Sequence, residues 1–113
     1  MKNIEFGKFG EEKGIEFLKR NGYKIIERNY KTKIGEIDII AKKEKQIIFI
    51  EVKTRSSDNY GFPEEAVNQR KLKKIEKVAY LYLKSKKTNL PIRFEVLSII
   101  KDKENFKFEI IPI

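Results

Sequence analysis

The spacing of apolar and polar residues predicts two helices in the chain. Apolar residues recur at helical intervals over residues 7–21, and Gly22 follows as a typical C-terminal stop. A second helix is expected to begin at Pro63, because proline followed by two acidic residues suits a first helical turn. This helix fades in the basic stretch 84–87. Its apolar stripe consists of Val67, Ile75, Val78, Ala79 and Tyr82.

Segments rich in Ile and Phe predict five strands. They cover residues 23–29, 35–41, 46–53, 92–100 and 106–113. The short polar loop 42–45 predicts a hairpin, and the helix after the third strand predicts a parallel crossover to the fourth. We therefore expect an α/β fold with a mixed β-sheet flanked by helices, in the order α-β-β-β-α-β-β. A chain of 113 residues fits a single domain, residues 1–113.

Composition removes several classes of chemistry. The chain has no Cys and no His, which excludes disulfides, thiolate catalysis, zinc fingers and imidazole general bases. No apolar run approaches the ~18 residues of a membrane span, and the first residues lack the apolar core of a secretion signal. We expect a cytoplasmic protein with no membrane partner, whose chemistry depends on carboxylates, Lys, hydroxyl groups or a metal held by oxygen.

The net charge of +9 favours a polyanionic partner, most simply nucleic acid. The same excess of lysine also arises from compositional bias without any functional demand, so charge alone leaves both interpretations open. The segment TRSSDNYGF, residues 54–62, is expected to be a mobile loop.

Acidic residues in apolar surroundings are the candidate functional groups. Asp38 interrupts a run of isoleucines in a predicted strand, so it either faces water at a sheet edge or is held by a partner. Glu36 shares its strand face and is either a further ligand or a surface residue. Glu51 and Lys53 share one face at the end of the next strand, where the strand could also simply run into solvent.

The first helix carries a fourth candidate. Glu11 lies about 40° from Ile15 and about 20° from Leu18 around the helix, so it points with the apolar stripe. Gly10 and Gly14 would let this helix approach the sheet closely. A partly exposed rim carboxylate is the simpler interpretation of Glu11 taken alone.

Together these residues indicate a metal site. One helical Glu, one strand Asp and a Glu-x-Lys pair can converge on one point, and carboxylates without imidazole suit Mg²⁺ or Mn²⁺. On a basic protein, such a cluster favours metal-assisted phosphodiester hydrolysis.

At these residues the sequence resembles a known superfamily. The pattern of Glu11, Asp38 and Glu51-Val52-Lys53 resembles the PD-(D/E)XK nucleases, particularly archaeal Holliday-junction resolvases. The blocks GEIDII, IFIEVKTR, GFPEEAV and RFEV resemble the YraN-like family of bacterial proteins, across residues 7–99. Ile37 stands where the superfamily commonly has a proline before its catalytic Asp.

The resemblance implies a restriction-endonuclease-like core and a Mg²⁺-dependent endonuclease acting on DNA, more than RNA, with branched DNA as a candidate substrate. It implies that Glu11, Asp38 and Glu51 bind metal and that Lys53 completes the catalytic set. It also suggests a homodimer, for which the Phe- and Ile-rich final strands offer a surface. The alternatives are a non-catalytic nucleic-acid-binding module on the same fold and an assembly partner whose charge is only compositional.

Three further residues are candidates for substrate contact. Arg55 directly follows the Glu-x-Lys pair and is a candidate for binding a phosphate. Lys71 lies about 40° from Ile75 on the second helix and either reaches towards the site or extends into solvent. Tyr60 could stack on a base, although packing within the turn is the simpler interpretation.

Overall fold

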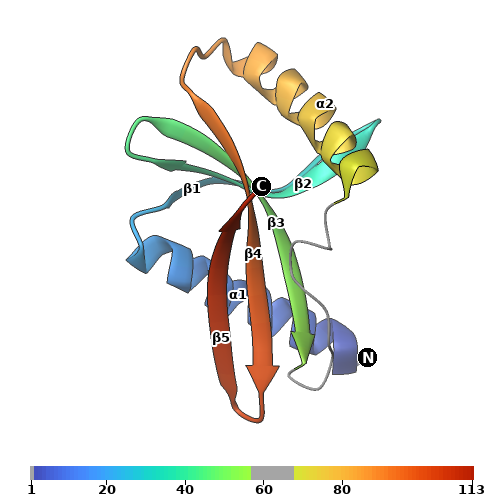
Figure 1. Cartoon of the computed structure of the whole chain (residues 1–113), viewed down its shortest axis with the longest axis vertical. Coiled ribbons are helices and arrows are strands. Elements are labelled where there is room, and N and C mark those ends of the chain that lie inside the picture. Colours follow the sequence, from blue (N-terminus) through green and yellow to red (C-terminus); the bar gives the residue numbers. More distant parts are fainter. Residues whose placement is uncertain (1, 57–67) are drawn as a thin grey trace.

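The computed structural model describes the backbone of residues 2–56 and 68–113, and side chains from residue 8 onward within those ranges. Two helices and five strands follow the predicted order (Figure 1). Their bounds are α1 Lys2–Arg20, β1 Lys24–Thr32, β2 Gly35–Lys43, β3 Gln46–Ser56, α2 Gln69–Lys86, β4 Ile92–Asp102 and β5 Asn105–Pro112.

The strands form one mixed sheet in the spatial order β1-β2-β3-β4-β5. β3 and β4 are parallel and every other neighbouring pair is antiparallel. Helix α2 lies between the parallel strands in the sequence, as a crossover connection requires. The predicted α/β class, the hairpin of β2 and β3 and the parallel pair are confirmed, and the arrangement is that of a restriction-endonuclease-like fold.

The two helices cover opposite faces of the sheet. Phe49 packs with Val78 and Tyr82 of α2, whereas its neighbours Ile48 and Ile50 belong to the core cluster that contains Leu18 of α1. Figure 1 shows α1 passing behind β4 and β5 and α2 crossing in front of β2. Adjacent residues of one strand therefore point to different helices, which follows from the period of two along a strand.

Glycines let α1 lie close to the sheet, as predicted. A Cβ at Gly14 would stand 2.9 Å from Cδ1 of Ile99 and 3.0 Å from Cδ2 of Leu97. A Cβ at Gly10 would stand 3.3 Å from Cγ2 of Thr54. Both positions lie within one turn of Glu11, so the close contact sets how near that carboxylate comes to β3.

Several predicted boundaries differ from the observed ones. α1 begins at Lys2, because Gly7 is tolerated inside the helix; it ends as predicted before Gly22, whose φ is +88°. Residues 54–56 were expected in a loop but belong to β3, because they pair with Ile99, Ile100 and Lys101 of β4. The rest of that expected loop, with Tyr60, and the expected helix start at Pro63 lie outside the described residues.

α2 begins at Gln69, later than the expected start at Pro63, because the backbone of Asn68 is extended. Asn68 is its N-cap, and the Asn68 side-chain oxygen accepts a hydrogen bond of 2.9 Å from the backbone N–H of Lys71. The buried residues of α2 are Ile75, Val78, Ala79 and Tyr82, as predicted, and the fifth predicted member, Val67, lies outside the described residues. Neither described helix has an apolar stretch long enough to cross a bilayer.

Candidate active site

The candidate residues lie where the sheet opens between β2 and β3. The two strands pair from Lys43 and Gln46 as far as Ile39 and Ile50, and there their pairing stops. The first part of β2 stays with β1, while β3 continues along β4 to Ser56. Asp38 and Glu51 are the next residues on the two strands, so the opening places both carboxylates at its apex.

Asp38 replaces the missing backbone pairing with its own side chain. Its Oδ2 accepts a hydrogen bond of 2.7 Å from the backbone N–H of Val52. Burial nevertheless raises the pKa of Asp38, and the nearby Glu36 carboxylate adds to that effect, while the Val52 N–H opposes it. The sheet thus holds an acidic group whose negative charge is only partly compensated.

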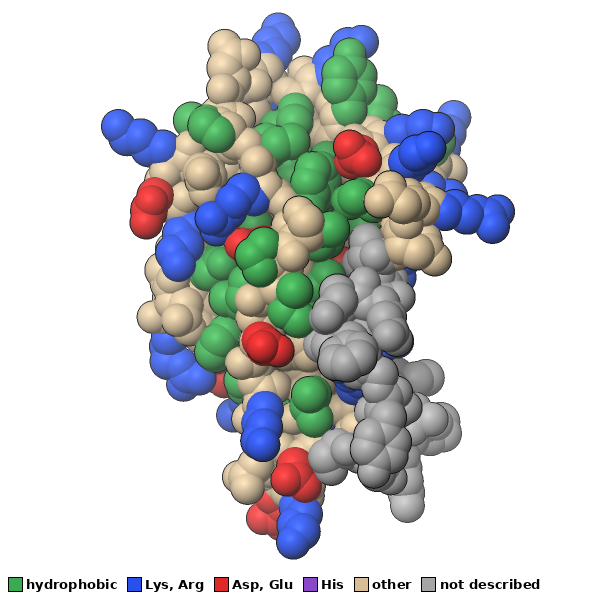
Figure 2. Space-filling view, viewed as in Figure 1, with side chains coloured by type: hydrophobic (Ala, Val, Ile, Leu, Met, Phe, Trp, Pro, Cys, Tyr) green, Lys and Arg blue, Asp and Glu red, His purple; other side chains and the backbone are tan. Residues whose placement is uncertain are grey.

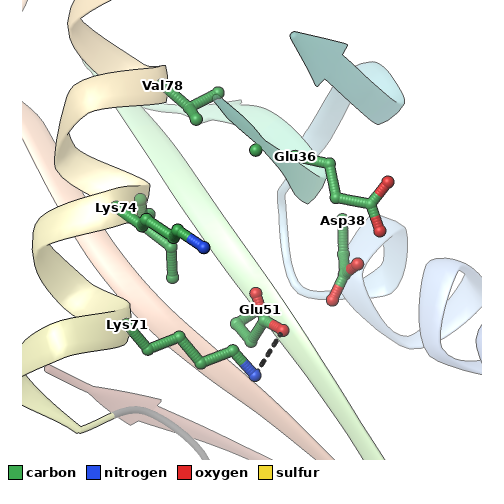
Figure 3. A pocket seen from close by; sticks show the side chains of 8 residues that line it. Glu36, Asp38, Glu51, Lys71, Lys74 and Val78 are labelled. Carbon is green, nitrogen blue, oxygen red and sulfur yellow. Dashed lines mark ion pairs between the residues drawn. The ribbon is translucent and has the colours of Figure 1, made fainter. Parts of the chain in front are cut away.

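Glu51 is the second acidic group of the opening. Its side chain is 15% exposed, and its Oε1 lies 3.3 Å from the Nζ of Lys71, which reaches over from α2 (Figure 3). Burial raises the pKa of Glu51 to about 6; the Asp38 carboxylate adds to the rise and the Lys71 ammonium opposes it. The Asp38 and Glu51 carboxyl groups lie close enough to influence each other's pKa.

Two hollows meet at Asp38, each with a volume of about 300 Å³. The hollow beneath α2 is lined by Gly35, Glu36, Asp38, Glu51, Lys71, Lys74, Ile75 and Val78. The hollow towards α1 is lined by Glu11, Asn29, Glu36, Asp38, Val52 and Thr54. Asp38 and Glu36 border both, so the opening in the sheet can be approached from either face.

Glu11 approaches Asp38 from the side of α1. Burial raises the pKa of Glu11, the Asp38 carboxylate raises it further, and the Arg28 guanidinium opposes both. Asp38 therefore interacts with both other predicted acids, with Glu51 in the hollow under α2 and with Glu11 in the other. Across the described ranges, no three acidic side chains are grouped tightly enough to hold a metal ion by themselves.

The basic residues are arranged differently from the expected pattern. Lys53 is exposed and lies on the same face of β3 as Glu51, but it lines neither hollow. Lys71 and Lys74 border the hollow instead, and Figure 3 shows both reaching in from α2. Lys74 was missed from the sequence; its position three residues after Lys71, on the same flank of a helix, is the pattern that could have indicated it.

Arg55 lies further along β3 than the opening. It is half-buried, and its Nε is buried without a hydrogen-bond partner in the described part of the chain. Its guanidinium therefore keeps unused donor capacity.

The donor set at the opening fits Mg²⁺ or Mn²⁺. Mg²⁺ commonly binds through one or two carboxylates, several waters and substrate phosphates rather than through a cage made only of protein. Asp38 and Glu51 supply two such carboxylates, and a 300 Å³ hollow beside them leaves room for water. Burial, the main cause of their raised pKa values, disfavours two negative charges here, and a bound divalent cation would stabilise them.

Comparison with known proteins identifies the family. The model of "Uncharacterised protein family UPF0102" matches residues 10–99. A UPF0102 protein of Dictyoglomus thermophilum is 50% identical over 104 residues, covering 91% of this chain and 88% of the relative. A UPF0102 protein of Clostridioides difficile is 51% identical over 100 residues, covering 88% of each chain. The chain therefore belongs to UPF0102, the YraN-like family, whose fold is that of the restriction-endonuclease-like superfamily.

Proposed function

We propose that the protein is a metal-dependent nuclease that hydrolyses phosphodiester bonds of DNA, with branched or structured DNA as the candidate substrate. The observation that carries this proposal is the meeting of Asp38 and Glu51 at the point where β2 and β3 separate. Lys71 and Lys74 in the same hollow provide positive charge beside the carboxylates, as a site for a phosphate requires.

Asp38 and Glu51 would hold one or two Mg²⁺ or Mn²⁺ ions, and Glu11 would complete or orient the surrounding shell from the α1 side. Such an ion, when bound, polarises the scissile phosphate and makes water a better nucleophile. The hydrogen bond from Val52 fixes Asp38, so the rigid sheet sets the position of this ligand. Lys53, on the same face as Glu51, would position the attacking water or stabilise charge developing on the phosphate.

Lys71 would pair first with Glu51 and then, in the complex with substrate, with a phosphate. Without substrate its ammonium neutralises Glu51 at 3.3 Å. With a divalent cation held by Asp38 and Glu51, Lys71 would be free to bind a phosphate oxygen of the substrate. The arrangement therefore favours substrate binding after the metal has bound, and Arg55 would contact the adjoining backbone.

The second candidate function is a non-catalytic nucleic-acid-binding module. The observation in its favour is that the three predicted acids do not form one compact cluster within the described residues. This module would bind nucleic acid in a salt-dependent manner without metal-dependent cleavage.

Cleavage assays decide between the two functions. The purified protein is incubated with labelled duplex, single-stranded, flapped and four-way-junction DNA in the presence of Mg²⁺ or Mn²⁺. Wild type is expected to cleave at least one of these substrates. Asp38→Asn and Lys53→Ala are expected to reduce the rate by about 10²–10³, the usual cost of losing one preorganised electrostatic group.

Glu104→Gln provides the matched control, because Glu104 is an exposed acidic residue in the turn between β4 and β5. This variant should cleave at the wild-type rate. Equal activity of wild type and Lys53→Ala on every substrate would show that the proposed mechanism is wrong. Salt-dependent binding without cleavage, together with Mn²⁺ binding that is unchanged in Asp38→Asn, would favour the binding module.

A further inference from the structure

Helix α2 accounts for most of the net positive charge of the protein. Its sequence has seven basic residues and one acidic residue, which gives a net charge of +6 for the helix. The whole chain has a net charge of +9. Figure 2 shows Lys and Arg side chains projecting around the part of the molecule where α2 lies. Basic side chains also occur elsewhere on the surface, but the excess of basic over acidic residues is concentrated on this helix.

The basic residues of the first half of α2 form a continuous surface that leads to the candidate site. Lys73 and Lys77 each lie about 160° from the buried Ile75, so they are on the outer side of the helix. Lys74 and Lys71 occupy the flank between that outer side and the hollow with Asp38 and Glu51. A phosphate chain lying on the outer side could thus continue directly into the hollow.

Helix stability does not explain this distribution. The first turn of α2 contains no acidic residue, although the positive end of the helix dipole favours acids there. Arg70 and Lys71 stand in that turn instead. Within the described part of the chain, Lys73 and Lys77 have no ion-pair partner that would compensate them. An uncompensated arrangement that opposes local stability is typical of a surface kept for a ligand.

An aromatic residue stands among these lysines. Tyr80 is 63% exposed, the most exposed of the large hydrophobic side chains in the described residues. It lies three residues after Lys77 and seven after Lys73, so the three occupy one row of the helix. Lysines that bind phosphates, next to an exposed ring on which a base can stack, are the combination that binds single-stranded nucleic acid.

We propose that the outer side of α2 is the docking surface for a single-stranded segment of nucleic acid. Lys73 and Lys77 bind successive phosphates, Tyr80 stacks on a base, and the strand continues past Lys74 to the carboxylates. The inference rests on the proposed function for its ligand and adds the substrate class and the path to the site. An anionic membrane is disfavoured because the apolar side of α2 is packed against the sheet and cannot insert.

Binding is measured by fluorescence anisotropy with a labelled single-stranded DNA of mixed sequence, in EDTA and at several KCl concentrations. The double variant Lys73→Gln/Lys77→Gln is expected to bind about tenfold more weakly. The slope of log affinity against log salt should fall by about 1.4, since each lost phosphate contact accounts for about 0.7 on single strands. Tyr80→Ala should weaken binding about fivefold or more, whereas Tyr80→Phe should keep it.

The matched control is Lys19→Gln/Arg20→Gln, which removes the same charge from exposed residues at the end of α1 on the other face of the sheet. It should change affinity less than twofold. Equal losses in the two double variants would mean that only net charge matters and would overturn the proposal. Equal binding by Tyr80→Ala and Tyr80→Phe would also overturn it, because the ring would have no role.

Two further outcomes separate this inference from the proposed function. If wild type binds through α2 but cleaves nothing with Mg²⁺ or Mn²⁺, the docking surface stands and the nuclease proposal fails. If wild type cleaves and Lys73→Gln/Lys77→Gln still binds like wild type, only the docking surface fails. Binding to phosphatidylserine vesicles that depends on Lys73 and Lys77, without binding to DNA, would assign the surface to a membrane and overturn the proposal.

Discussion

Two ion pairs in this protein have similar geometry, but we expect substitution of their carboxylates to change stability in opposite directions. Glu51 meets Lys71 at 3.3 Å, and Glu95 meets Arg93 at 2.9 Å. The two cations are almost equally exposed, at 46% for Lys71 and 45% for Arg93. Both carboxylates are largely withdrawn from water, with exposures of 15% for Glu51 and 3% for Glu95. The ion pairs themselves therefore do not distinguish the candidate site at Glu51 from the surroundings of Glu95.

The difference lies in the second neighbour of each carboxylate. Glu95 accepts a hydrogen bond of 2.8 Å from the hydroxyl of the buried Tyr23, so both of its oxygens have donors. Glu51 has the carboxyl group of Asp38 beside it instead. Burial, together with the hydrogen bond to Glu95, raises the pKa of Tyr23 to about 12, so this donor stays protonated at neutral pH. Both oxygens of Glu95 therefore have donors, whereas Glu51 has one cation, Lys71, and a second carboxyl group beside it.

The largest loss of stability is expected from substitution of Glu95, the carboxylate paired with Arg93. Glu95→Ala removes the acceptor of the buried Tyr23 hydroxyl and leaves a cavity, whereas Arg93 can turn to solvent. An unpaired buried hydroxyl with a cavity beside it should lower the free energy of unfolding by about 3 kcal/mol. Urea denaturation at pH 7 measures this loss.

Glu109→Ala provides the control for this variant, because Glu109 is an exposed residue of β5 opposite Ser98. It should change the free energy of unfolding by less than about 0.5 kcal/mol. If Glu95→Ala were no more destabilising than Glu109→Ala, the buried cluster would have no structural importance and the comparison would collapse.

Substitution of Glu51 should increase stability instead of reducing it. Glu51→Gln removes the repulsion between Glu51 and Asp38, so the variant should be more stable than wild type by about 1 kcal/mol at pH 8. The raised pKa means that folding favours the protonated form, so wild type should lose stability as pH rises from 4.5 through 6. The variant should show a smaller decline, because the raised pKa values of Asp38 and Glu11 remain. The rise in pKa alone corresponds to a loss of at most about 2 kcal/mol in the free energy of unfolding. We expect a smaller loss, because Glu51 keeps some contact with water.

Thermal denaturation between pH 4 and pH 8 tests this prediction. The curves of wild type and Glu51→Gln should approach each other below pH 4.5 and separate above pH 6. Saturating Mg²⁺ should stabilise wild type more than the variant, since the ion replaces the missing compensation. A variant less stable than wild type at pH 8 would make Glu51 a structural residue like Glu95.

The same comparison shows how far sequence reasoning reaches. Asp38 and Glu95 both interrupt apolar strands, so their local patterns are of the same kind. Only the fold distinguishes the two residues. Glu95 accepts a hydrogen bond from Tyr23, 72 residues away in the chain, whereas Asp38 lies beside the carboxyl group of Glu51. Periodicity identified the elements and the parallel pair because these depend on local spacing. It could not show where β2 and β3 part, which depends on how each strand pairs with its other neighbour.

The basic residues illustrate a second limit. Alternation correctly places Lys53 on the same face of β3 as Glu51, but Lys71 and Lys74 line the hollow because of how α2 packs across the sheet. Residues 54–56 have the composition of a loop, yet pairing with β4 makes them a strand. Both differences come from contacts between segments far apart in the sequence, which composition and spacing do not encode.

The smallest expected change in stability comes from substitution of Lys71, the cation paired with Glu51. Lys71→Ala should reduce the free energy of unfolding by only about 0.5 kcal/mol at pH 8, because the ammonium is almost half exposed. At pH 5 the loss should disappear, since Glu51 is then largely protonated. Arg93→Ala should cost more than Lys71→Ala at both pH values, because it leaves the more deeply buried carboxylate.

The affinity of Lys71→Ala for Mn²⁺ shows whether Lys71 competes with a metal ion for Glu51. If Lys71 occupies the place of a divalent cation, its loss should strengthen Mn²⁺ binding in the absence of DNA by about fivefold, equivalent to about 1 kcal/mol. Isothermal titration at pH 8 measures this change, and Glu51→Gln should bind Mn²⁺ more weakly than wild type. Weaker Mn²⁺ binding by Lys71→Ala would mean that the ammonium supports the site instead of competing with the ion. Glu51 and Lys71 would then form a structural pair, and the contrast with Glu95 and Arg93 would be one of degree only.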